Sequence, residues 1–133
     1  MEYSPEAFVE RFGDAQFEAE VLPTPMGYPL LELALPHALL FAFDRGAPPT
    51  PHGRMNLLLH GVVERHWEEG GPPSAIPGTG GRYRFRGRVR RIYGDGFYLF
   101  ESVAPLVLAS NEPLPTGAEV TVITLPPLMG FRP

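Results

Sequence analysis

Apolar and polar residues alternate with a period of two along much of this chain, which is the pattern of half-buried β-strands. The first such stretch is Gln16–Val21. Two short apolar runs follow, Leu30–Leu35 and Leu39–Phe43, and periodicity alone leaves a helix open for the second. We interpret both as strands, because prolines separate them at lengths typical of strands. Met55–Trp67 then predicts one long strand with apolar residues on both faces near its centre.

The N-terminal residues follow a helical pattern instead. Ser4 is a favoured N-cap residue, and Pro5 suits the first helical position, where a missing N–H costs nothing. Phe8 and Phe12 fall one turn apart and share a face. The pattern predicts a short helix from Pro5 to Phe12, ended by Gly13 in the left-handed conformation.

The most regular alternation lies in the C-terminal half, where arginine occupies every second position of one strand. The sequence Gly94-Asp95-Gly96 is a strong hairpin signal, and Phe97–Glu101 follows as the partner strand. With Asp95 and Gly96 as a two-residue turn, Arg90 faces Glu101 as an opposite-charge pair. Arg91 breaks the alternation, which predicts a bulge at Arg90 and Arg91. The alternating arginines are Arg82, Arg84, Arg86, Arg88 and Arg90.

These elements predict a β-rich α+β fold, with a short N-terminal helix packed on a twisted, mainly antiparallel sheet. Two further strands are expected at about 105–109 and 119–125, and closure into a partial barrel stays open. At 133 residues the chain has the usual length of one domain. Residues 70–81 contain five glycines and three prolines, so we expect a flexible loop there, inside a single domain at 1–133.

Two segments of the sequence resemble each other. Leu59–Trp67 and Phe85–Tyr93 share glycine, valine and arginine at matching positions. Similar packing rules for two strands explain this, and an internal duplication is the alternative.

From Arg86 to Leu125, a G-x-V strand, a tight hairpin and a G-x-x-V-x-V strand resemble small oligonucleotide-binding barrels. The resemblance concerns the fold alone, and the helix usual between the third and fourth strands of these barrels has no room here.

The composition excludes several kinds of chemistry. With no cysteine the chain has neither disulfides nor thiolates, and with arginine as its only strongly basic residue it has no lysine for Schiff-base or Walker-type chemistry. No apolar run reaches the ~18 residues of a membrane helix, and the acidic N-terminus lacks the apolar segment of a secretory signal. We therefore expect a cytoplasmic protein without membrane contact. The arginine bias and the 17 prolines suggest a GC-rich, thermophilic source.

The net charge of −4 hides an asymmetry between the two halves of the chain. Residues 1–70 hold four arginines against eleven acidic residues, and residues 71–133 hold seven against four, so the halves carry −7 and +3. Alternate residues of a strand lie ~6.6 Å apart, so the arginines at 82–90 form a row suited to phosphate groups. An anionic ligand or a nucleic acid is therefore a candidate partner of this row. A homo-oligomer is a separate possibility that the sequence leaves open.

Two other interpretations of the arginine row stay open. It is also the pattern of a solvated outer sheet face whose charges prevent edge-to-edge pairing, and that of a surface for a protein partner. The aromatic residues of the strand occupy the intervening positions and point to the opposite face, which weakens a stacking role. We favour a non-enzymatic binding or assembly module. The rival class is an uncharacterised enzyme with a pocket between helix and sheet.

No cofactor or metal site is expected. His60, Glu64 and His66 share a face of a regular strand, but the two histidines then lie ~20 Å apart, too far to bind one metal ion. Glu64 and His66 alone make a poor site, and His52 only precedes the strand. We therefore expect ordinary surface histidines, and we identify no serine with a histidine nearby or a nucleophile-elbow pattern.

Overall fold

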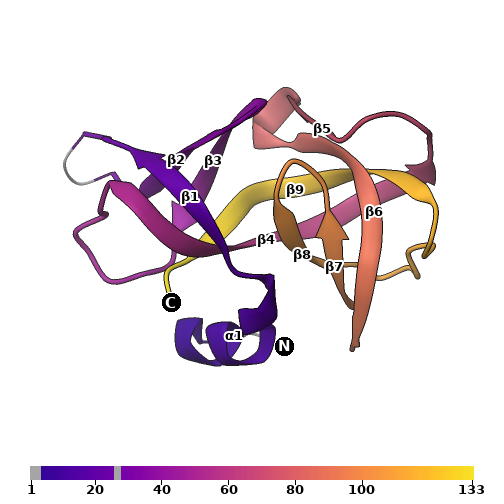
Figure 1. The fold of residues 1–133 in the computed structure, drawn as a ribbon, viewed down its shortest axis with the longest axis horizontal. Helices are drawn as coiled ribbons and strands as arrows, with labels where there is room; N and C mark the ends of the chain where they lie inside the picture. Colours follow the sequence, from indigo (N-terminus) through magenta and orange to yellow (C-terminus); the bar gives the residue numbers. More distant parts are fainter. Residues whose placement is uncertain (1–3, 26–27) are drawn as a thin grey trace.

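The structure, a computed structural model, describes residues 4–25 and 28–133. It confirms the predicted β-rich α+β fold: a short N-terminal helix accompanies one mixed sheet of nine strands (Figure 1). The elements are α1 (Pro5–Phe12), η1 (Gly13–Ala15), β1 (Phe17–Leu22), β2 (Leu30–Leu35), β3 (Ala38–Asp44), β4 (Gly53–Glu68), β5 (Ser74–Pro77), η2 (Thr79–Gly81), β6 (Tyr83–Gly94), β7 (Phe97–Glu101), β8 (Pro105–Ala109) and β9 (Glu119–Phe131), where η marks a 3₁₀ helix.

Helix α1 begins as the sequence predicts and ends differently. The Ser4 hydroxyl accepts a hydrogen bond from the Ala7 N–H at 3.1 Å, which caps the helix. Gly13 is right-handed, with φ −60° and ψ −23°, so the predicted left-handed end is wrong. The reason is that the chain turns on into η1, where the Gln16 N–H donates to the Gly13 carbonyl, and this 3₁₀ turn needs right-handed dihedrals.

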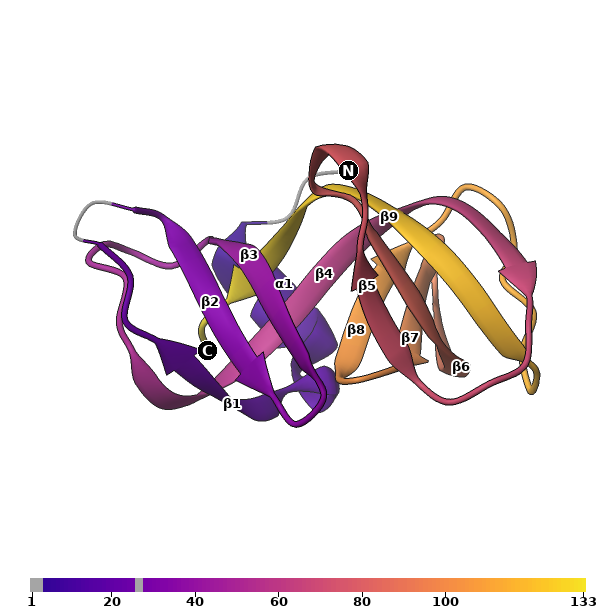
Figure 2. The ribbon, with the colours of Figure 1, turned by 90° about the horizontal axis from the view of Figure 1, so that it is seen from above.

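Strands β4 and β9 pair along the long axis of the molecule and take part in two rings of strand pairing (Figures 1 and 2). In the first ring, β1, β2 and β3 form an antiparallel meander whose ends pair with β4 and β9. In the second ring, β6, β7 and β8 form a meander whose ends pair with β9 and β4. The β3–β9 and β4–β8 pairings are parallel, and the other pairings between these strands are antiparallel, as expected for a mainly antiparallel sheet.

The two rings repeat one arrangement of four strands. Each strand from β1 to β4 has its counterpart about 66 residues later, among β6 to β9. The registers repeat too: Leu33 pairs with Leu40 in the first meander, and Phe100 pairs with Leu106 in the second. The repetition therefore relates β1–β4 to β6–β9, and not Leu59–Trp67 to Phe85–Tyr93. Residue identities do not reveal it, because the alternation of buried and exposed positions is what recurs.

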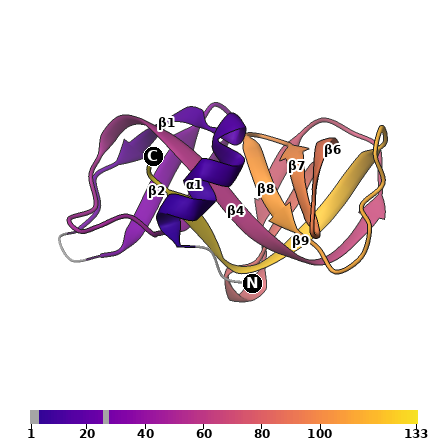
Figure 3. The ribbon, with the colours of Figure 1, turned by 90° about the horizontal axis from the view of Figure 1, so that it is seen from below.

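The apolar residues form two clusters. The larger one fills the inside of the rings and includes Leu57, Leu59 and Phe85, all fully buried. The smaller one lies under α1, which crosses the outside of β4 (Figure 3), and it joins Phe8 and Phe12 to buried residues of β4, β8 and β9. Strand β4 contributes to both clusters, because Leu58 points to the helix and its neighbours point inward. This explains the predicted strand with two apolar faces.

The arginine hairpin has the predicted turn and a different register. Asp95 and Gly96 both have positive φ, 56° and 81°, as a type I′ turn requires. The bulge at Arg90 is present, because Val89 pairs with Phe100 and Arg91 with Leu99. A second irregularity, before Gly94, shifts the pairing again, so Arg88 faces Glu101. The predicted Arg90–Glu101 pair is wrong, because the sequence pattern reveals only one of the two irregularities.

Two further segments differ from the expectation. Residues 70–81 are not a loop throughout, since β5 pairs with β6 from Ser74 opposite Arg86 to Pro77 opposite Tyr83. The flexibility of this segment stays a prediction. Strand β9 continues beyond the expected end at 125 to Phe131, because its second half lies between β3 and β4 in the first ring.

Candidate polyanion-binding face

Strand β6 places the predicted arginines toward the outside of the second ring. Its alternation buries Tyr83, Phe85 and Val89 in the ring interior, so the arginines between them point outward. Residues 83–86 lie between β5 and β9, and both neighbours pair with them. This part of β6 is therefore not a sheet edge, and protection against edge pairing does not explain the charges of Arg84 and Arg86.

Three of the five arginines are held by glutamates that lie in β4, directly after β4, or in β9. Arg82 donates to both carboxylate oxygens of Glu64, at 3.0 and 3.1 Å. Arg86 lies 2.8 Å from Glu69, and Arg88 lies 3.2 Å from Glu119. These pairs fix the direction of each guanidinium group and neutralise part of its charge. They are partly exposed, so each contributes little to stability.

Hydrogen bonds lower the pKa of each of these three glutamates. The Arg82 guanidinium lowers the pKa of Glu64 through its hydrogen bonds. The Trp67 indole N–H is the main cause of the lowered pKa of Glu69, and the charge of Arg86 adds to it. The backbone N–H of Gly71 lowers the pKa of Glu119. The face therefore carries fixed negative charges among its arginines at neutral pH.

Arg84 and Arg90 form no ion pair with any residue that the structure describes. Arg84 is exposed and lies between Ile76 of β5 and Ile123 of β9 by register. Arg90 is the extra residue of the bulge and, with Arg88, lines a small pocket of about 140 Å³. Neither guanidinium group is held in an ion pair by the described residues, although the charge of Arg84 acts on Glu69 and the pocket beside Arg90 is also lined by Glu101 and Glu119.

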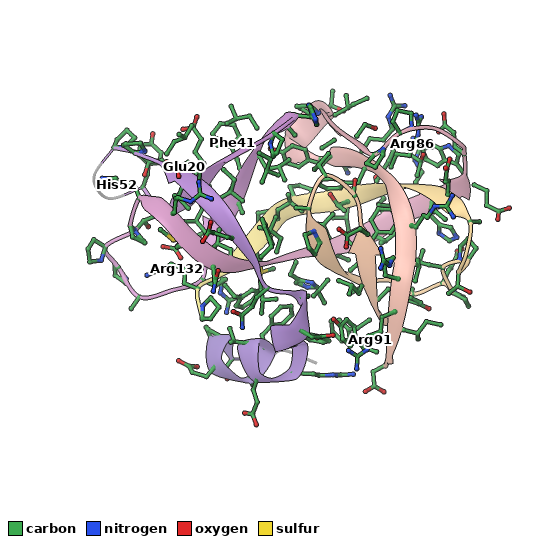
Figure 4. The ribbon with its side chains drawn as sticks, in the orientation of Figure 1. Glu20, Phe41, His52, Arg86, Arg91 and Arg132 are labelled. Carbon is green, nitrogen blue, oxygen red and sulfur yellow. The ribbon has the colours of Figure 1, made fainter. Side chains whose placement is uncertain are left out.

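A third strand adds a cation and an aromatic ring to this face. Arg65 of β4 pairs with Ile123 of β9, which pairs in turn with Arg84, so the three residues form one row across the sheet. In the next row Trp67 and Arg86 flank Thr121 of β9 in the same way. We call the outward residues of this region the basic face: Arg65, Trp67, Arg82, Arg84, Arg86, Arg88 and Arg90 (Figure 4 labels Arg86).

Trp67 is half-exposed and fixed in place. Its indole N–H donates to Glu69 at 2.8 Å, and the Arg65 guanidinium lies 5.6 Å from the centre of its ring. The expectation that the aromatic residues of β6 point inward is confirmed for Tyr83 and Phe85, but the stacking surface comes from β4 instead. Sequence reasoning missed Arg65 and Trp67, because only the pairing of β9 with both β4 and β6 brings them beside the arginine row.

His60 is not an ordinary surface histidine. Its ring lies 5.1 Å from that of Phe8 beneath α1, and its Nδ1 lies 2.7 Å from the Val107 carbonyl oxygen. Burial lowers the pKa of His60. Strand β4 also has two register shifts, one between His60 and Val62 and one between Val63 and Arg65. They break the regular alternation that would place His60, Glu64 and His66 on one face. Within residues 4–25 and 28–133, no group of three or more potential ligands is placed to hold a metal ion.

A pocket between helix and chain end bears on the enzyme alternative. It measures about 470 Å³ and is lined by α1, by Arg45–Ala47 and by the last two residues. Its charged lining residues are Glu6, Glu10, Arg45 and Arg132. Among the described residues that line it there is no serine, threonine or histidine.

Comparisons with known proteins leave the basic face as the main guide to function. No family model, no curated protein and no solved structure matches the chain. In the part of the chain that the structure describes, no helix has the length and apolarity needed to cross a bilayer.

Proposed function

We propose that the basic face binds single-stranded nucleic acid, as part of a small, non-enzymatic binding module acting in the cytoplasm. The observation that carries the proposal is the placement of Trp67 in one sheet face with two unpaired arginines, Arg65 and Arg84. A guanidinium group binds phosphate with two parallel hydrogen bonds, and an indole ring offers a stacking surface to any base. Alternating cations and an aromatic ring are the usual means of holding a single strand without reading its sequence.

The ion pairs of the face limit the expected affinity. Arg82, Arg86 and Arg88 already interact with glutamates, so Arg65, Arg84 and Arg90 are the groups expected to contact phosphates. Each phosphate contact contributes about −0.7 to the slope of log K against log salt for single strands. Three contacts therefore predict a slope of about −2, smaller than a row of five free arginines would give.

The chain offers a direct reporter for this binding, because Trp67 is its single tryptophan. A labelled oligonucleotide is titrated with protein at several salt concentrations, and both fluorescence anisotropy and Trp67 emission are followed. We expect binding at low salt with quenching of the indole, and a slope near −2. No binding at about 20 mM salt contradicts the proposal.

Matched variants test which residues take part. Arg84→Gln and Arg54→Gln each remove one positive charge, but Arg54 lies in the first ring beside Glu18. Arg84→Gln is expected to reduce the slope by about 0.7, and Arg54→Gln to leave it unchanged. Trp67→Leu is expected to weaken binding about tenfold, since stacking on one base contributes about 1–3 kcal/mol. Equal effects of the two arginine variants would indicate general attraction and not a site.

A further inference from the structure

A stripe of large apolar side chains lies on the outside of the first ring. Leu39, Phe41 and Phe43 alternate along β3 and are 45%, 44% and 39% exposed. Figure 4 shows Phe41 on the outside of β3, on the side of the molecule away from α1. Single exposed apolar residues are ordinary, but three in a row on one strand are typical of an interaction surface.

In the second ring, the strand that corresponds to β3 is covered by α1. By register, Phe41 in β3 corresponds to Val107 in β8, because Leu40 and Leu106 occupy matching places in the two meanders. Val107 is fully buried in the cluster beneath α1, together with Phe8 and Phe12. In the first ring the counterparts of α1 and η1, about 66 residues later, are β5 and η2. Strand β5 contacts β3 but leaves Leu39, Phe41 and Phe43 partly exposed, so the apolar stripe of β3 is not covered as Val107 is.

The charges beside the stripe indicate what covers it. Glu32 of β2 lies directly opposite Phe41, and Glu20 of β1 lies opposite Ala34 on the same outer face. Glu32 forms no ion pair with the residues that the structure describes. Glu20 lies directly opposite Arg54 of β4 and feels its charge, but the Arg54 guanidinium forms its ion pair with Glu18 instead. We call this surface the acidic face: Glu20, Glu32, Leu39, Phe41 and Phe43.

The complementary surface is present on the same chain. On the basic face, the unpaired Arg65 and Arg84 alternate with Ile123 and Ile76, so cations and apolar side chains again lie side by side. Ile76 is 44% exposed. Strands β1 and β6 occupy equivalent places in the two repeats, yet the outward residues of β1 are acidic and those of β6 are basic.

We propose that the acidic face of one copy of this protein binds the basic face of a second copy. The apolar stripe of β3 then packs against Ile76 and Ile123, and the unpaired glutamates meet the unpaired arginines. A symmetric contact between two acidic faces would instead place Glu20 and Glu32 against their own like charges, which is unfavourable. Two different surfaces meet in this head-to-tail contact, so association continues beyond a dimer unless the rotation closes a ring.

The oligomeric state tests this proposal. Sedimentation equilibrium is measured on the wild type and on two variants, the acidic-face variant Glu20→Arg with Glu32→Arg and the basic-face variant Arg65→Glu with Arg84→Glu. The wild-type mass is expected to rise with concentration. Each variant is expected to associate at least tenfold more weakly, because its altered face repels the unaltered one. An equimolar mixture of the two variants is expected to associate again, since each supplies the face that the other has lost.

The controls separate electrostatic matching from other effects. The variant Glu10→Arg with Glu112→Arg has the same change in net charge as the acidic-face variant, but both residues are exposed outside the two faces, and it should associate as the wild type does. Circular dichroism confirms that each variant is folded. A wild type that stays monomeric at about 1 mM overturns the proposal, and so does a mixture of variants that fails to associate. Unchanged association of the acidic-face variant would show that Glu20 and Glu32 lie outside the contact, and this would also overturn the proposal.

The same variants distinguish this proposal from nucleic-acid binding. The acidic-face variant keeps the basic face intact, so it should bind a labelled oligonucleotide as the charge-matched variant Glu10→Arg with Glu112→Arg does, while it no longer associates. If the wild type associates and binds no oligonucleotide, only the proposed function fails. If it binds oligonucleotide as a monomer at every concentration, only the inferred self-association fails. When both hold, the oligonucleotide competes with the second copy and lowers the average mass.

Discussion

Gly87 in β6 lies so close to Glu101 in β7 that a side chain at position 87 would overlap the Glu101 carbonyl oxygen. A Cβ atom there would also come within 3.0 Å of the Ser102 Cα, and neither obstacle is the flexible end of a side chain. Gly87→Ala is therefore expected to lower the free energy of unfolding by about 2 kcal/mol, because the hairpin must shift to admit the methyl group. Urea denaturation measures the change.

Gly13 provides the matched control. It is right-handed, and a Cβ atom there would meet its nearest neighbour, the Gln16 side chain, at an ordinary 3.5 Å. Gly13→Ala is expected to raise the free energy of unfolding by about 0.5 kcal/mol, because alanine reduces the conformational freedom of the unfolded chain. If Gly13→Ala lowers the stability, Gly13 has the left-handed conformation predicted from the sequence. If Gly87→Ala leaves the stability unchanged, β6 and β7 do not approach each other as closely as described.

The buried Asp44–Arg132 pair ties the end of β3 to the end of the chain. Arg132 donates to both Asp44 oxygens, at 2.9 and 3.2 Å, and the Gly46 N–H and Thr50 hydroxyl donate to the same carboxylate. Arg132→Met leaves a carboxylate that is 6% exposed without its cation, so a loss of about 3 kcal/mol is expected.

A second variant tests whether the loss comes from the uncompensated charge. Combining Arg132→Met with Asp44→Asn should cost less than the two single losses added together, because the stranded charge is then absent. Thermal denaturation of the three variants measures this coupling. The exposed Arg54–Glu18 pair is the control, and Arg54→Met is expected to change stability much less. Additive losses at Asp44 and Arg132 would show that the two residues act independently.

His60 makes stability depend on pH in the weakly acidic range. Burial lowers its pKa in the folded protein, so below about pH 6.5 the unfolded chain binds a proton that the folded protein resists. The unfolded state then holds more protons, and the free energy of unfolding falls as the pH falls, by up to ~1.4 kcal/mol per pH unit. Above the unfolded pKa this contribution is fully present.

Chemical denaturation between pH 7.5 and 5.5 measures this dependence for the wild type and His60→Gln. The variant should be less stable at pH 7.5 because it disturbs the packing of Phe8, but its stability should change little over the range. Glu64, Glu69 and Glu119 have lowered pKa values, so their contributions are lost only at more acidic pH. Parallel curves for wild type and variant would exclude His60 as the cause.

Residues 70–81 are expected to be cut first in limited proteolysis. Their glycines and prolines favour an exposed segment that opens easily, and only Ser74–Pro77 within them pairs with a neighbouring strand. Thermolysin at low ratio, followed by mass spectrometry of the fragments, locates the first cut. Protection of this segment together with earlier cleavage elsewhere would show that β5 holds it firmly.

Local signals explain most of what the sequence predicted. The cap at Ser4, the alternation in β1 and β6 and the turn at Asp95 each depend on neighbouring residues, and each appears in the structure. The register of the hairpin could not be predicted in this way, because it depends on two irregularities in β6. Arg91 interrupts the alternation and reveals the first, but no residue reveals the second, before Gly94.

The composition of the basic face depends on contacts between distant residues. The outward direction of Arg84 follows from alternation alone, but its neighbour Arg65 lies in another strand and reaches the same row only through Ile123. The pairing of Arg86 with Glu69 is equally non-local. No periodicity within one strand carries such information, and for the same reason the helix contact of His60 could not be foreseen from its place in β4.

The sharing of β4 and β9 between the rings has a consequence for each half of the molecule. A separate chain of one repeat would carry its meander and one long strand, but it would lack the second long strand that closes its ring. Only another such chain could supply that strand, and the second chain would need the long strand of the first to close its own ring. Two half-length chains would therefore be interlocked, and the intact protein is the single-chain counterpart of a strand-exchanged dimer whose halves cannot part without unfolding.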